Sequence, residues 1–250
     1  MSKVVITAGG SGIGRAMAEA FHEAGHQVWV TDVTDTGSQN VPWKTTICDA
    51  SSERDTHNLF HEINTSWGEV DVVCANAGIA GPTSVIEDTD LTAWQECVSV
   101  NLEGAFLTAK YAAPLMKRKG SGSLVFTTST AGLFGYPNRA PYAAAKWGII
   151  GLMKRAAMEL GPFGIRANAI APGAVEGPRM EGVLEREAAT KGMTRDEVYT
   201  GYAAGTSMRT FVTASDIAAM AVFLGSGAAR HVSGQVIAVD GHTENPDPKP

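Results

Sequence analysis

Short apolar runs and helical stretches alternate along almost the whole chain, and this alternation constrains the fold more than any other feature. Seven runs are typical of short buried strands, at 4–8, 27–31, 43–48, 71–75, 123–128, 166–171 and 235–239. Helical patterns lie between them at 13–24, 52–67, 91–119, 141–160 and 214–224. Apolar strands that alternate with helices pair in parallel, because each helix carries the chain back across the sheet. The sequence therefore predicts an α/β fold, a doubly wound parallel sheet of about seven strands with helices on both faces.

The composition narrows the classes of protein that fit this fold. A chain of 250 residues suits one domain, and a net charge of −6 without a basic block argues against a nucleic-acid partner. Cys48, Cys74 and Cys97 are too widely spaced for a metal or redox pair, so we expect buried apolar thiols in a reducing compartment. No apolar run approaches the ~20 residues that span a bilayer, and a strand pattern near the start argues against a cleavable signal. We expect a soluble, cytoplasmic protein with no membrane partner and no metal.

One segment, residues 176–212, interrupts the alternation between the sixth strand pattern and the last helix pattern. It carries several arginines, tyrosines and methionines. Insertions of this length in compact domains are usually lids or binding loops, so we expect this one to cover the substrate. The tail at 242–250 contains three prolines, which exclude helix and central strand and predict a loose or docked extension. All of 1–250 is then one catalytic domain with a lid and a tail.

A glycine-rich turn directly follows the first strand pattern and opens into the first helix pattern. Residues 7–14 read Thr-Ala-Gly-Gly-Ser-Gly-Ile-Gly. Free N–H groups at a helix N-terminus attract phosphate, and glycine lets the backbone approach it closely. The spacing differs from Gly-x-Gly-x-x-Gly, and the Gly-Lys-Ser/Thr ending of a P-loop is absent. We predict a dinucleotide pyrophosphate here, with a purely structural glycine turn as the alternative.

Asp32 ends the second strand pattern, eighteen residues after Gly14. A carboxylate at that point suits the two ribose hydroxyls of NAD and repels the 2′-phosphate of NADP. Neither Ser11 nor Val33 supplies a cation for that phosphate, and Arg15 is expected at the start of the helix. The sequence therefore favours NAD over NADP as cofactor, and a turn-capping role is the alternative for Asp32.

Tyr142 and Lys146 stand four residues apart in a helical pattern, and Ser129 precedes the tyrosine by thirteen residues. Positions i and i+4 share a helix face, so the phenol and the ammonium project side by side. The cation favours the phenolate and lowers the tyrosine pKa towards a useful range. Ser129 would orient a substrate oxygen. The alternative is an exposed chance pair, since Tyr-x-x-x-Lys is common in helices.

Together these motifs resemble the short-chain dehydrogenase/reductase family over essentially the full chain, which implies a Rossmann-like fold. The matching residues occur in the family's order: Gly12-Ile-Gly14, Asp49 after the third strand pattern, Ala75-Asn-Ala-Gly78 after the fourth, Asn101 in the long helix, Ser129, Tyr142 with Lys146, and Pro172-Gly173 after the sixth. Any one motif is weak, but a set in register predicts membership of the family.

The resemblance implies a role for each matching residue. Tyr142 would be the general acid/base, and Lys146 would lower its pKa and bind the nicotinamide ribose. Ser129 would hold the substrate oxygen, and Asn101 would perturb its helix and hold a water that links Lys146 to solvent, an ordinary helix-interior asparagine being the alternative. The implied cofactor-binding residues are Gly9, Ser11, Gly12, Ile13, Gly14, Asp32, Asp49, Ala50, Asn76, Ala77, Gly78, Tyr142, Lys146, Pro172, Gly173 and Val175.

Three residues depart from the family pattern. Ala8 replaces the first glycine of the loop, which we expect to be tolerated if its φ is negative. Ala75 replaces an asparagine and removes one side-chain hydrogen bond. Gly177 stands where the family often has a threonine that helps to hold the carboxamide, so the departure affects how the lid contacts the cofactor.

The predicted activity is reversible hydride transfer between NAD(H) and a secondary alcohol/ketone pair. An NADPH-dependent 3-oxoacyl thioester reductase of the same fold is one alternative, and a non-catalytic nucleotide-sensing or scaffold protein is another. A scaffold would be expected to lack a proton-handling residue, and a dehalogenase-type variant to lack Lys146. A sugar epimerase of related fold would need a longer C-terminal domain.

The substrate and the assembly are predicted from weaker signals. Leu133, Phe134 and Tyr136, just beyond Ser129, suggest an apolar wall. Arg179 could anchor an anionic substrate such as a carboxylate or sulfonate, although a solvated or ion-paired lid residue is the favoured interpretation. Family resemblance implies a homotetramer or homodimer, which pairs the long helices.

Overall fold

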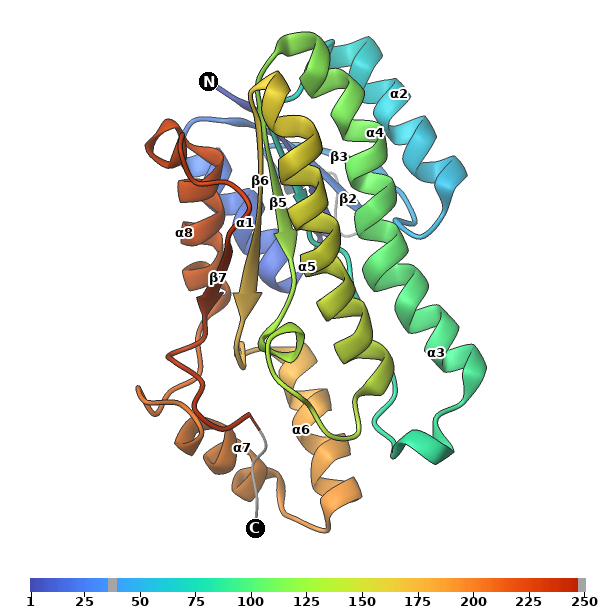
Figure 1. Cartoon of the computed structure of the whole chain (residues 1–250), viewed down its shortest axis with the longest axis vertical. Helices are drawn as coiled ribbons and strands as arrows, with labels where there is room; N and C mark the ends of the chain where they lie inside the picture. The colour runs from blue at the N-terminus through green and yellow to red at the C-terminus, as the bar shows by residue number, and fades with distance from the viewer. Residues whose placement is uncertain (36–39, 247–250) are drawn as a thin grey trace.

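Seven parallel strands form one sheet through the centre of the molecule, in the computed structural model that describes residues 1–35 and 40–246 (Figure 1). Their order is β3-β2-β1-β4-β5-β6-β7. The bounds are β1 Lys3–Thr7, β2 Gln27–Asp32, β3 Lys44–Ile47, β4 Val72–Ala75, β5 Gly122–Thr127, β6 Ile165–Pro172 and β7 Val236–Val239. The chain builds the sheet outward from β1 to β3 and then returns to place β4 on the other side of β1. The crevice at the carboxyl ends of β1 and β4 is where such sheets bind ligands.

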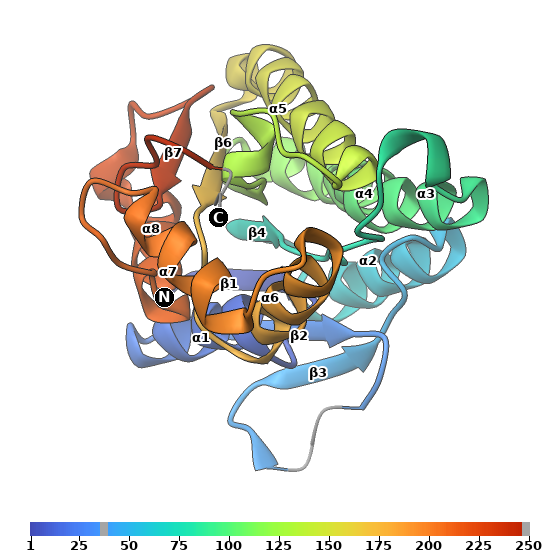
Figure 2. The same cartoon turned by 90° about the horizontal axis from the view of Figure 1, so that it is seen from below.

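Helices cover both faces of the sheet, as predicted. They are α1 Gly12–Glu23, α2 Glu53–Trp67, α3 Leu91–Val98, α4 Gly104–Lys119, α5 Ala140–Leu160, α6 Pro178–Lys191, α7 Arg195–Ala204 and α8 Ala214–Gly225. Helices α1 and α8 pack together on one face, and α2, α4 and α5 lie on the other (Figure 2). The three apolar residues of β1 face two apolar cores: Val5 packs with α2, α4 and α5, whereas Val4 and Ile6 pack with α1 and α8. Burial on both faces explains why the inner strands are continuous apolar runs.

The prediction of seven buried strands is wrong for the two edge strands, β3 and β7. No residue of β3 or β7 is buried, although the patterns at 43–48 and 235–239 predicted buried strands. Each edge strand has one neighbour, β2 or β6, so half of its surroundings is open. The three cysteines are buried and unpaired, as predicted. Burial raises the pKa of Cys48 to about 11 and that of Cys74 to about 12.

The helical pattern predicted at 91–119 is not one continuous α-helix. A π-helical turn, η3 (Ser99–Glu103), separates α3 from α4. Such turns are rare and occur frequently at functional sites, because they redirect the side chains within the turn. Asn101 lies at the centre of this one.

The segment at 176–212 contains two helices, α6 and α7, which lie below the carboxyl ends of the strands in Figure 1. We refer to this segment as the lid, after its predicted role. A capping box formed by Thr194 and Glu197 begins α7. Residues 242–245 dock beside the end of α7, where the N–H groups of Glu244 and Asn245 donate to the carbonyl of Gly205 at 2.8 and 3.0 Å. The predicted tail is therefore docked at its start, and 247–250 lie outside the described residues.

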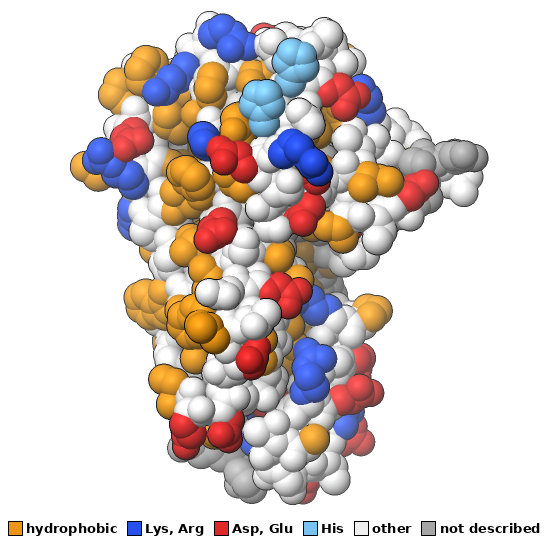
Figure 3. Space-filling view, turned by 90° about the vertical axis from the view of Figure 1, so that its right-hand side faces the viewer, with side chains coloured by type: hydrophobic (Ala, Val, Ile, Leu, Met, Phe, Trp, Pro, Cys, Tyr) orange, Lys and Arg blue, Asp and Glu red, His pale blue; other side chains and the backbone are white. Residues whose placement is uncertain are grey.

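Exposed apolar side chains mark the outer surface of the helical layer. Figure 3 shows hydrophobic side chains gathered on the face that α3 and α4 present. Leu91 in α3, Phe106 in α4 and Trp147 in α5 are among the exposed large apolar residues. No helix in the described part of the chain is long and apolar enough to cross a membrane.

Candidate active site

The four candidate catalytic residues come from three segments that meet at the carboxyl end of the sheet. Ser129 lies two residues after β5, Tyr142 and Lys146 lie in the first two turns of α5, and Asn101 lies in η3. Lys146 Nζ is 5.5 Å from the centroid of the Tyr142 ring. It also donates a hydrogen bond to the carbonyl of Thr127, the last residue of β5, at 2.9 Å. The fold thus brings the predicted residues together.

Opposing effects act on the Tyr142 phenol. Burial raises its pKa, whereas the positive charges of Lys146, Arg179 and Arg139 and a hydrogen bond with Ser129 lower it. The lowering effects prevail, so the pKa lies below the usual value of 10.0. A phenol with a lowered pKa exchanges its proton more readily near neutral pH.

Lys146 is a buried cation held by the backbone around it. Only 2% of its surface is exposed. Burial lowers the pKa of its ammonium group, and the adjacent Tyr142 opposes that shift. The Thr128 hydroxyl donates to the Lys146 carbonyl at 2.7 Å, which ties α5 to the end of β5. The ammonium position is therefore fixed relative to both Ser129 and Tyr142.

Asn101 is held by its amide nitrogen and leaves its amide oxygen free. Nδ2 donates to the carbonyls of Cys97 at 2.8 Å and Ile79 at 3.1 Å. Oδ1 is buried and has no protein partner. A Cβ added to Gly78 would lie 2.5 Å from Asn101 Oδ1 and 3.3 Å from Lys146 Nζ, so both atoms approach the same backbone position. A buried acceptor next to an ammonium group suits a bound water.

The glycine turn allows a close backbone approach that a side chain would block. A Cβ on Gly14 would lie 2.1 Å from the carbonyl oxygen of Ala8 and 2.7 Å from Asn76 Nδ2. Asn76 Nδ2 donates to the carbonyls of Thr7 and Ala8 at 3.2 and 3.3 Å, and Thr127 donates to its Oδ1 at 3.1 Å. The predicted cofactor residue Asn76 therefore holds the phosphate loop to the ends of β4 and β5.

Ala8 adopts a conformation other than the one under which we expected it to be tolerated. Its φ is +50°, in the left-handed region. An L-residue there costs about 1–2 kcal/mol because its Cβ crowds the following carbonyl. The loop therefore carries strain at the position where the family has glycine. Gly177, by contrast, has a φ of +135°, which a threonine would adopt only under strain.

Asp32 lies at the end of β2, beside the glycine loop. Its Oδ2 accepts from the N–H of Gly10 at 3.0 Å, and its Oδ1 accepts from the N–H of Val33 at 2.9 Å. Arg15 pairs with Glu19 at 2.7 Å and lies over the Trp43 ring at 5.0 Å from its centroid. The nearest candidate cation for a 2′-phosphate therefore already has partners.

The remaining predicted cofactor residues line the same edge of the sheet. Asp49 Oδ1 accepts from the Ser51 N–H at 2.9 Å and the Ser51 hydroxyl at 2.7 Å, just before α2. Pro172 ends β6, and the N–H of Gly173 donates to the Val239 carbonyl at 3.0 Å. Val175 follows β6 and forms an isolated parallel bridge with Val212. The others follow β3 or β4 or lie in the glycine loop: Gly9, Ser11, Gly12, Ile13, Ala50, Ala77 and Gly78. A glycine turn that opens into a helix N-terminus, with a carboxylate beside it, fits a dinucleotide.

Comparison with known proteins agrees with this geometry. A family model described as enoyl-(acyl carrier protein) reductase matches residues 7–242. Levodione reductase from Leifsonia aquatica is 32% identical over 95% of this chain and 92% of its own length. The chain is a short-chain dehydrogenase/reductase.

Further members of the family show the same extent of similarity. Cis-4-hydroxycyclohexanecarboxylate dehydrogenase from Sinomonas cyclohexanicum is 33% identical over 95% of this chain and 94% of its own length. The crystal structure of an NAD⁺-bound xylitol dehydrogenase superimposes with a TM-score of 0.91 at 25% identity, covering 96% of this chain and 98% of the other. These relatives are named for dehydrogenase and reductase activities, which supports oxidoreduction of an alcohol or ketone.

The predicted substrate residues of this short-chain dehydrogenase/reductase divide into two groups. Tyr136 stacks on Tyr202 of α7, with ring centroids 6.4 Å apart, so it joins the lid to the turn after β5. Leu133 and Phe134 are half-buried in that turn, between Ser129 and Tyr136. Arg179, the second residue of α6, donates to the carbonyl of Gly78 at 3.0 Å and so reaches from the lid to the loop after β4.

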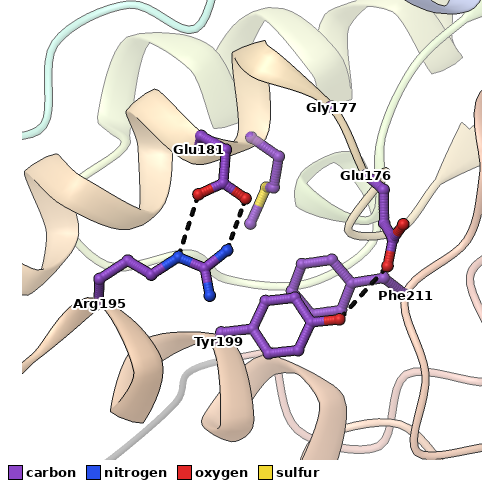
Figure 4. Close-up of a pocket in the computed structure, with 7 residues that line it drawn as sticks. Glu176, Gly177, Glu181, Arg195, Tyr199 and Phe211 are labelled. Carbon is purple, nitrogen blue, oxygen red and sulfur yellow. Dashed lines mark hydrogen bonds and ion pairs between the residues drawn. The ribbon is translucent and has the colours of Figure 1, made fainter.

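A pocket of about 400 Å³ lies in the lid, between α6, α7 and the approach to α8 (Figure 4). Arg195 forms two hydrogen bonds with Glu181, at 3.0 and 2.6 Å, across one side of it. Tyr199 stacks on Phe211 at 4.2 Å between ring centroids and donates to Glu176 at 3.3 Å. None of the four catalytic candidates lines this pocket, and its one lining arginine, Arg195, is paired with Glu181.

One residue of the site escaped the sequence predictions. Arg139 immediately precedes α5, and its guanidinium carbon lies 5.0 Å from the centroid of the Tyr142 ring. The signal was its position three residues before the candidate catalytic tyrosine. Only the fold shows that this arginine is buried and directed towards the phenol.

Proposed function

We propose that this protein catalyses reversible hydride transfer between NAD(H) and a secondary alcohol or ketone, with Tyr142 as general acid/base. The observation that carries the proposal is the meeting of Ser129, Tyr142 and Lys146 at the carboxyl end of the sheet, with Lys146 Nζ 5.5 Å from the centroid of the Tyr142 ring. The charges of Lys146 and Arg179 and a hydrogen bond with Ser129 lower the pKa of the phenol. The glycine loop, Asp32, and the residues after β4 and β6 would hold the cofactor. When bound, the nicotinamide ring accepts or supplies the hydride.

The protein's own residues handle the proton. In oxidation, the Tyr142 phenolate takes the hydroxyl proton of the alcohol, while the Ser129 hydroxyl orients the same oxygen. Lys146 stabilises the phenolate, and a water on Asn101 Oδ1 would carry the proton onward to solvent. In reduction, the Tyr142 phenol donates the proton to the carbonyl oxygen.

A coupled screen tests this activity. Purified protein is incubated with NAD⁺ and secondary alcohols that include sugars, hydroxy acids, sulfonates, aromatic alcohols and steroids, and NADH formation is followed by absorbance. We expect turnover of at least one class, and a loss of about 100- to 10,000-fold in Tyr142→Phe. A Tyr142→Phe protein with near-normal turnover would exclude the proposed mechanism, and no turnover at all would favour a nucleotide-binding scaffold.

We infer NAD rather than NADP as cofactor because a carboxylate, Asp32, stands where the 2′-phosphate would lie, and Arg15 already pairs with Glu19. Initial rates with the two cofactors should favour NAD by at least about tenfold. Asp32→Ser should reduce that preference by weakening the NAD reaction more than the NADP reaction. A strong NADPH preference in the wild type would instead support the alternative, a 3-oxoacyl thioester reductase.

We also infer that the protein forms a homodimer or homotetramer in the cytoplasm. The apolar side chains of Phe106 and Trp147 are exposed on α4 and α5, where a second copy would cover them. Light scattering after size exclusion should give twice or four times the mass of 26.2 kDa. Phe106→Asp with Trp147→Asp should shift the protein towards a monomer, and an unchanged mass in that variant would place the interface elsewhere.

A further inference from the structure

Two arginines beside the candidate catalytic tyrosine have no carboxylate partner in the described part of the chain. Arg139 approaches the Tyr142 ring from the start of α5, and Arg179 reaches the same region from the start of α6. By contrast, Arg15 and Arg195 form ion pairs with acidic side chains. The chain is acidic overall, with a net charge of −6, yet Arg139 and Arg179 place two cations without a carboxylate partner beside the same phenol in the described part of the chain.

Both guanidinium groups are held by neutral carbonyls of one short stretch after β4. Arg179 Nη1 donates to the Gly78 carbonyl at 3.0 Å, and Arg139 Nη2 donates to the Ala80 carbonyl at 3.1 Å. The carbonyl between them, that of Ile79, accepts from Asn101 Nδ2 at 3.1 Å. Three successive carbonyls thus fix three polar side chains around the site. Carbonyls orient a guanidinium group but do not neutralise it.

Arg139 is the more informative of the two. Only 8% of its surface is exposed, and its Nε is buried without any hydrogen-bond partner. A buried donor or charge without a partner is costly, so it requires an explanation, such as a bound water, an ion or a functional role. The guanidinium lies against the face of the Tyr142 ring. Apart from the bond from Nη2 to the Ala80 carbonyl, its N–H donors have no hydrogen-bond partner in the described part of the chain, and the remaining Nη donors are available to an anion.

Tuning of the Tyr142 pKa alone does not account for this arrangement. Lys146 already supplies a buried cation on the same helix, and its charge lowers the tyrosine pKa more than either arginine does. A cation needed only for its field would not have to bury an unsatisfied Nε. Guanidinium groups bind carboxylates and other oxyanions through paired N–H donors, which gives the free donors a specific use.

We propose that Arg139 and Arg179 form an anion subsite beside Tyr142, so that the substrate is a secondary alcohol or ketone that also carries a carboxylate or similar oxyanion. Arg139 is the buried anchor, and Arg179 closes the subsite from the lid. This inference rests on the proposed function, because it assigns the substrate class of the same site.

Matched substrates test the subsite. The hydroxy acid 4-hydroxycyclohexanecarboxylate, its methyl ester and the corresponding hydroxy sulfonate are compared in the NAD⁺-coupled assay, as are linear hydroxy acids with their esters. We expect kcat/KM to be about 30-fold or more higher for the acid or the sulfonate than for the neutral ester, mainly through KM. The ratio of acid to sulfonate distinguishes the two kinds of oxyanion.

Variants show whether the arginines cause that preference. Arg139→Gln should lower kcat/KM for the anion by about 30-fold more than for the ester, because loss of its charge also raises the Tyr142 pKa and slows both reactions. Arg139→Lys should retain part of the preference. Arg179→Gln should have a smaller effect of the same kind. Arg186→Gln, on the exposed side of α6, is the matched control and should leave the preference unchanged. NADH binding by fluorescence shows that each variant retains its fold.

The experiments distinguish an absent anion subsite from an absent dehydrogenase activity. Equal rates on esters and acids, or an equal loss on both in Arg139→Gln, would overturn the subsite and leave the dehydrogenase intact. No turnover on any alcohol would count against the proposed function. In that event, calorimetric titration with cyclohexanecarboxylate and its amide tests the subsite alone. Preferential binding of the acid that is lost in Arg139→Gln supports it, and absence of a preference overturns it.

Discussion

Two regions of the molecule depend on different kinds of interaction. One is the part around β1, β2 and β4, and the other is the lid formed by α6 and α7. In the first, function depends on the backbone: glycine positions, carbonyl groups and helix N-termini create the cradle. In the lid, an apolar cluster that includes Leu184, Tyr202 and Phe211 holds the helices together. Constraints on the backbone require particular residues at fixed spacing, so they can be recognised as short sequence motifs. Apolar packing requires only hydrophobic side chains, so it is visible in a sequence only as composition. This difference explains why individual residues could be predicted in the glycine loop, whereas for the lid the sequence indicated only its position at 176–212.

The largest expected effect comes from filling the cradle. Gly14→Ala places a methyl 2.1 Å from the Ala8 carbonyl, so the backbone must move, at a cost of about 3 kcal/mol of unfolding free energy, together with loss of NADH binding. Chemical denaturation and NADH fluorescence measure the two effects. Gly151→Ala, in α5 with no atom within 4 Å of the added methyl, is the control and should be neutral or stabilising by up to about 1 kcal/mol. Equal stability of the two variants would contradict the backbone account.

A medium effect is expected in the lid, where one polar contact is buried among apolar residues. Tyr202 donates to Glu187 at 2.6 Å, and Lys191 pairs with the same carboxylate at 2.8 Å. Tyr202→Phe leaves the carboxylate short of one donor, which costs about 1–3 kcal/mol. Hydrogen exchange should accelerate in α6 and α7 and remain unchanged in β1, β4 and β5. Uniform acceleration across the sheet would mean that the lid does not open as a separate unit.

The smallest effect is a gain in stability in the phosphate loop. Ala8→Gly removes the left-handed strain at φ +50°, and after the entropic cost of glycine the net stabilisation should be about 0.5–1 kcal/mol. The urea midpoint measures it. Ala189→Gly, an exposed position in α6, should instead destabilise by about 1 kcal/mol. If Ala8→Gly destabilised the protein as Ala189→Gly does, the backbone at Ala8 would not be strained.

Most of the fold could be predicted because each inner strand is buried on both faces and each helix shows a periodic pattern. The π turn at Asn101 could not be derived from periodicity, since it depends on where the side-chain amide finds the carbonyls of Cys97 and Ile79. The two lid helices, α6 and α7, were not predicted, because glycine and charged residues interrupt their short helical patterns. The conformation of Ala8 follows from close packing of the loop on Gly14, which spacing alone does not reveal.

Arg139 shows the same limit at the site itself. Its sequence position near Tyr142 is visible, but its burial and unpartnered Nε depend on the loop after β4, more than fifty residues earlier in the chain. Local spacing predicted that Tyr142 and Lys146 share a helix face, and the fold brings them together with Ser129. Their catalytic roles remain predictions. Sequence analysis did not identify Arg139, because its position in the site depends on a hydrogen bond to a carbonyl that is distant in the sequence.

The pH dependence of alcohol oxidation tests the central claim, proton transfer by Tyr142, most directly. Since the phenolate is the base, kcat/KM should rise with pH and level off, with a midpoint below the usual tyrosine value of 10.0 because of the nearby cations. Tyr142→Phe should bind NADH, lose about 100- to 10,000-fold of the rate and lose this midpoint. A Tyr142→Phe protein that keeps both the rate and the wild-type profile would contradict the account.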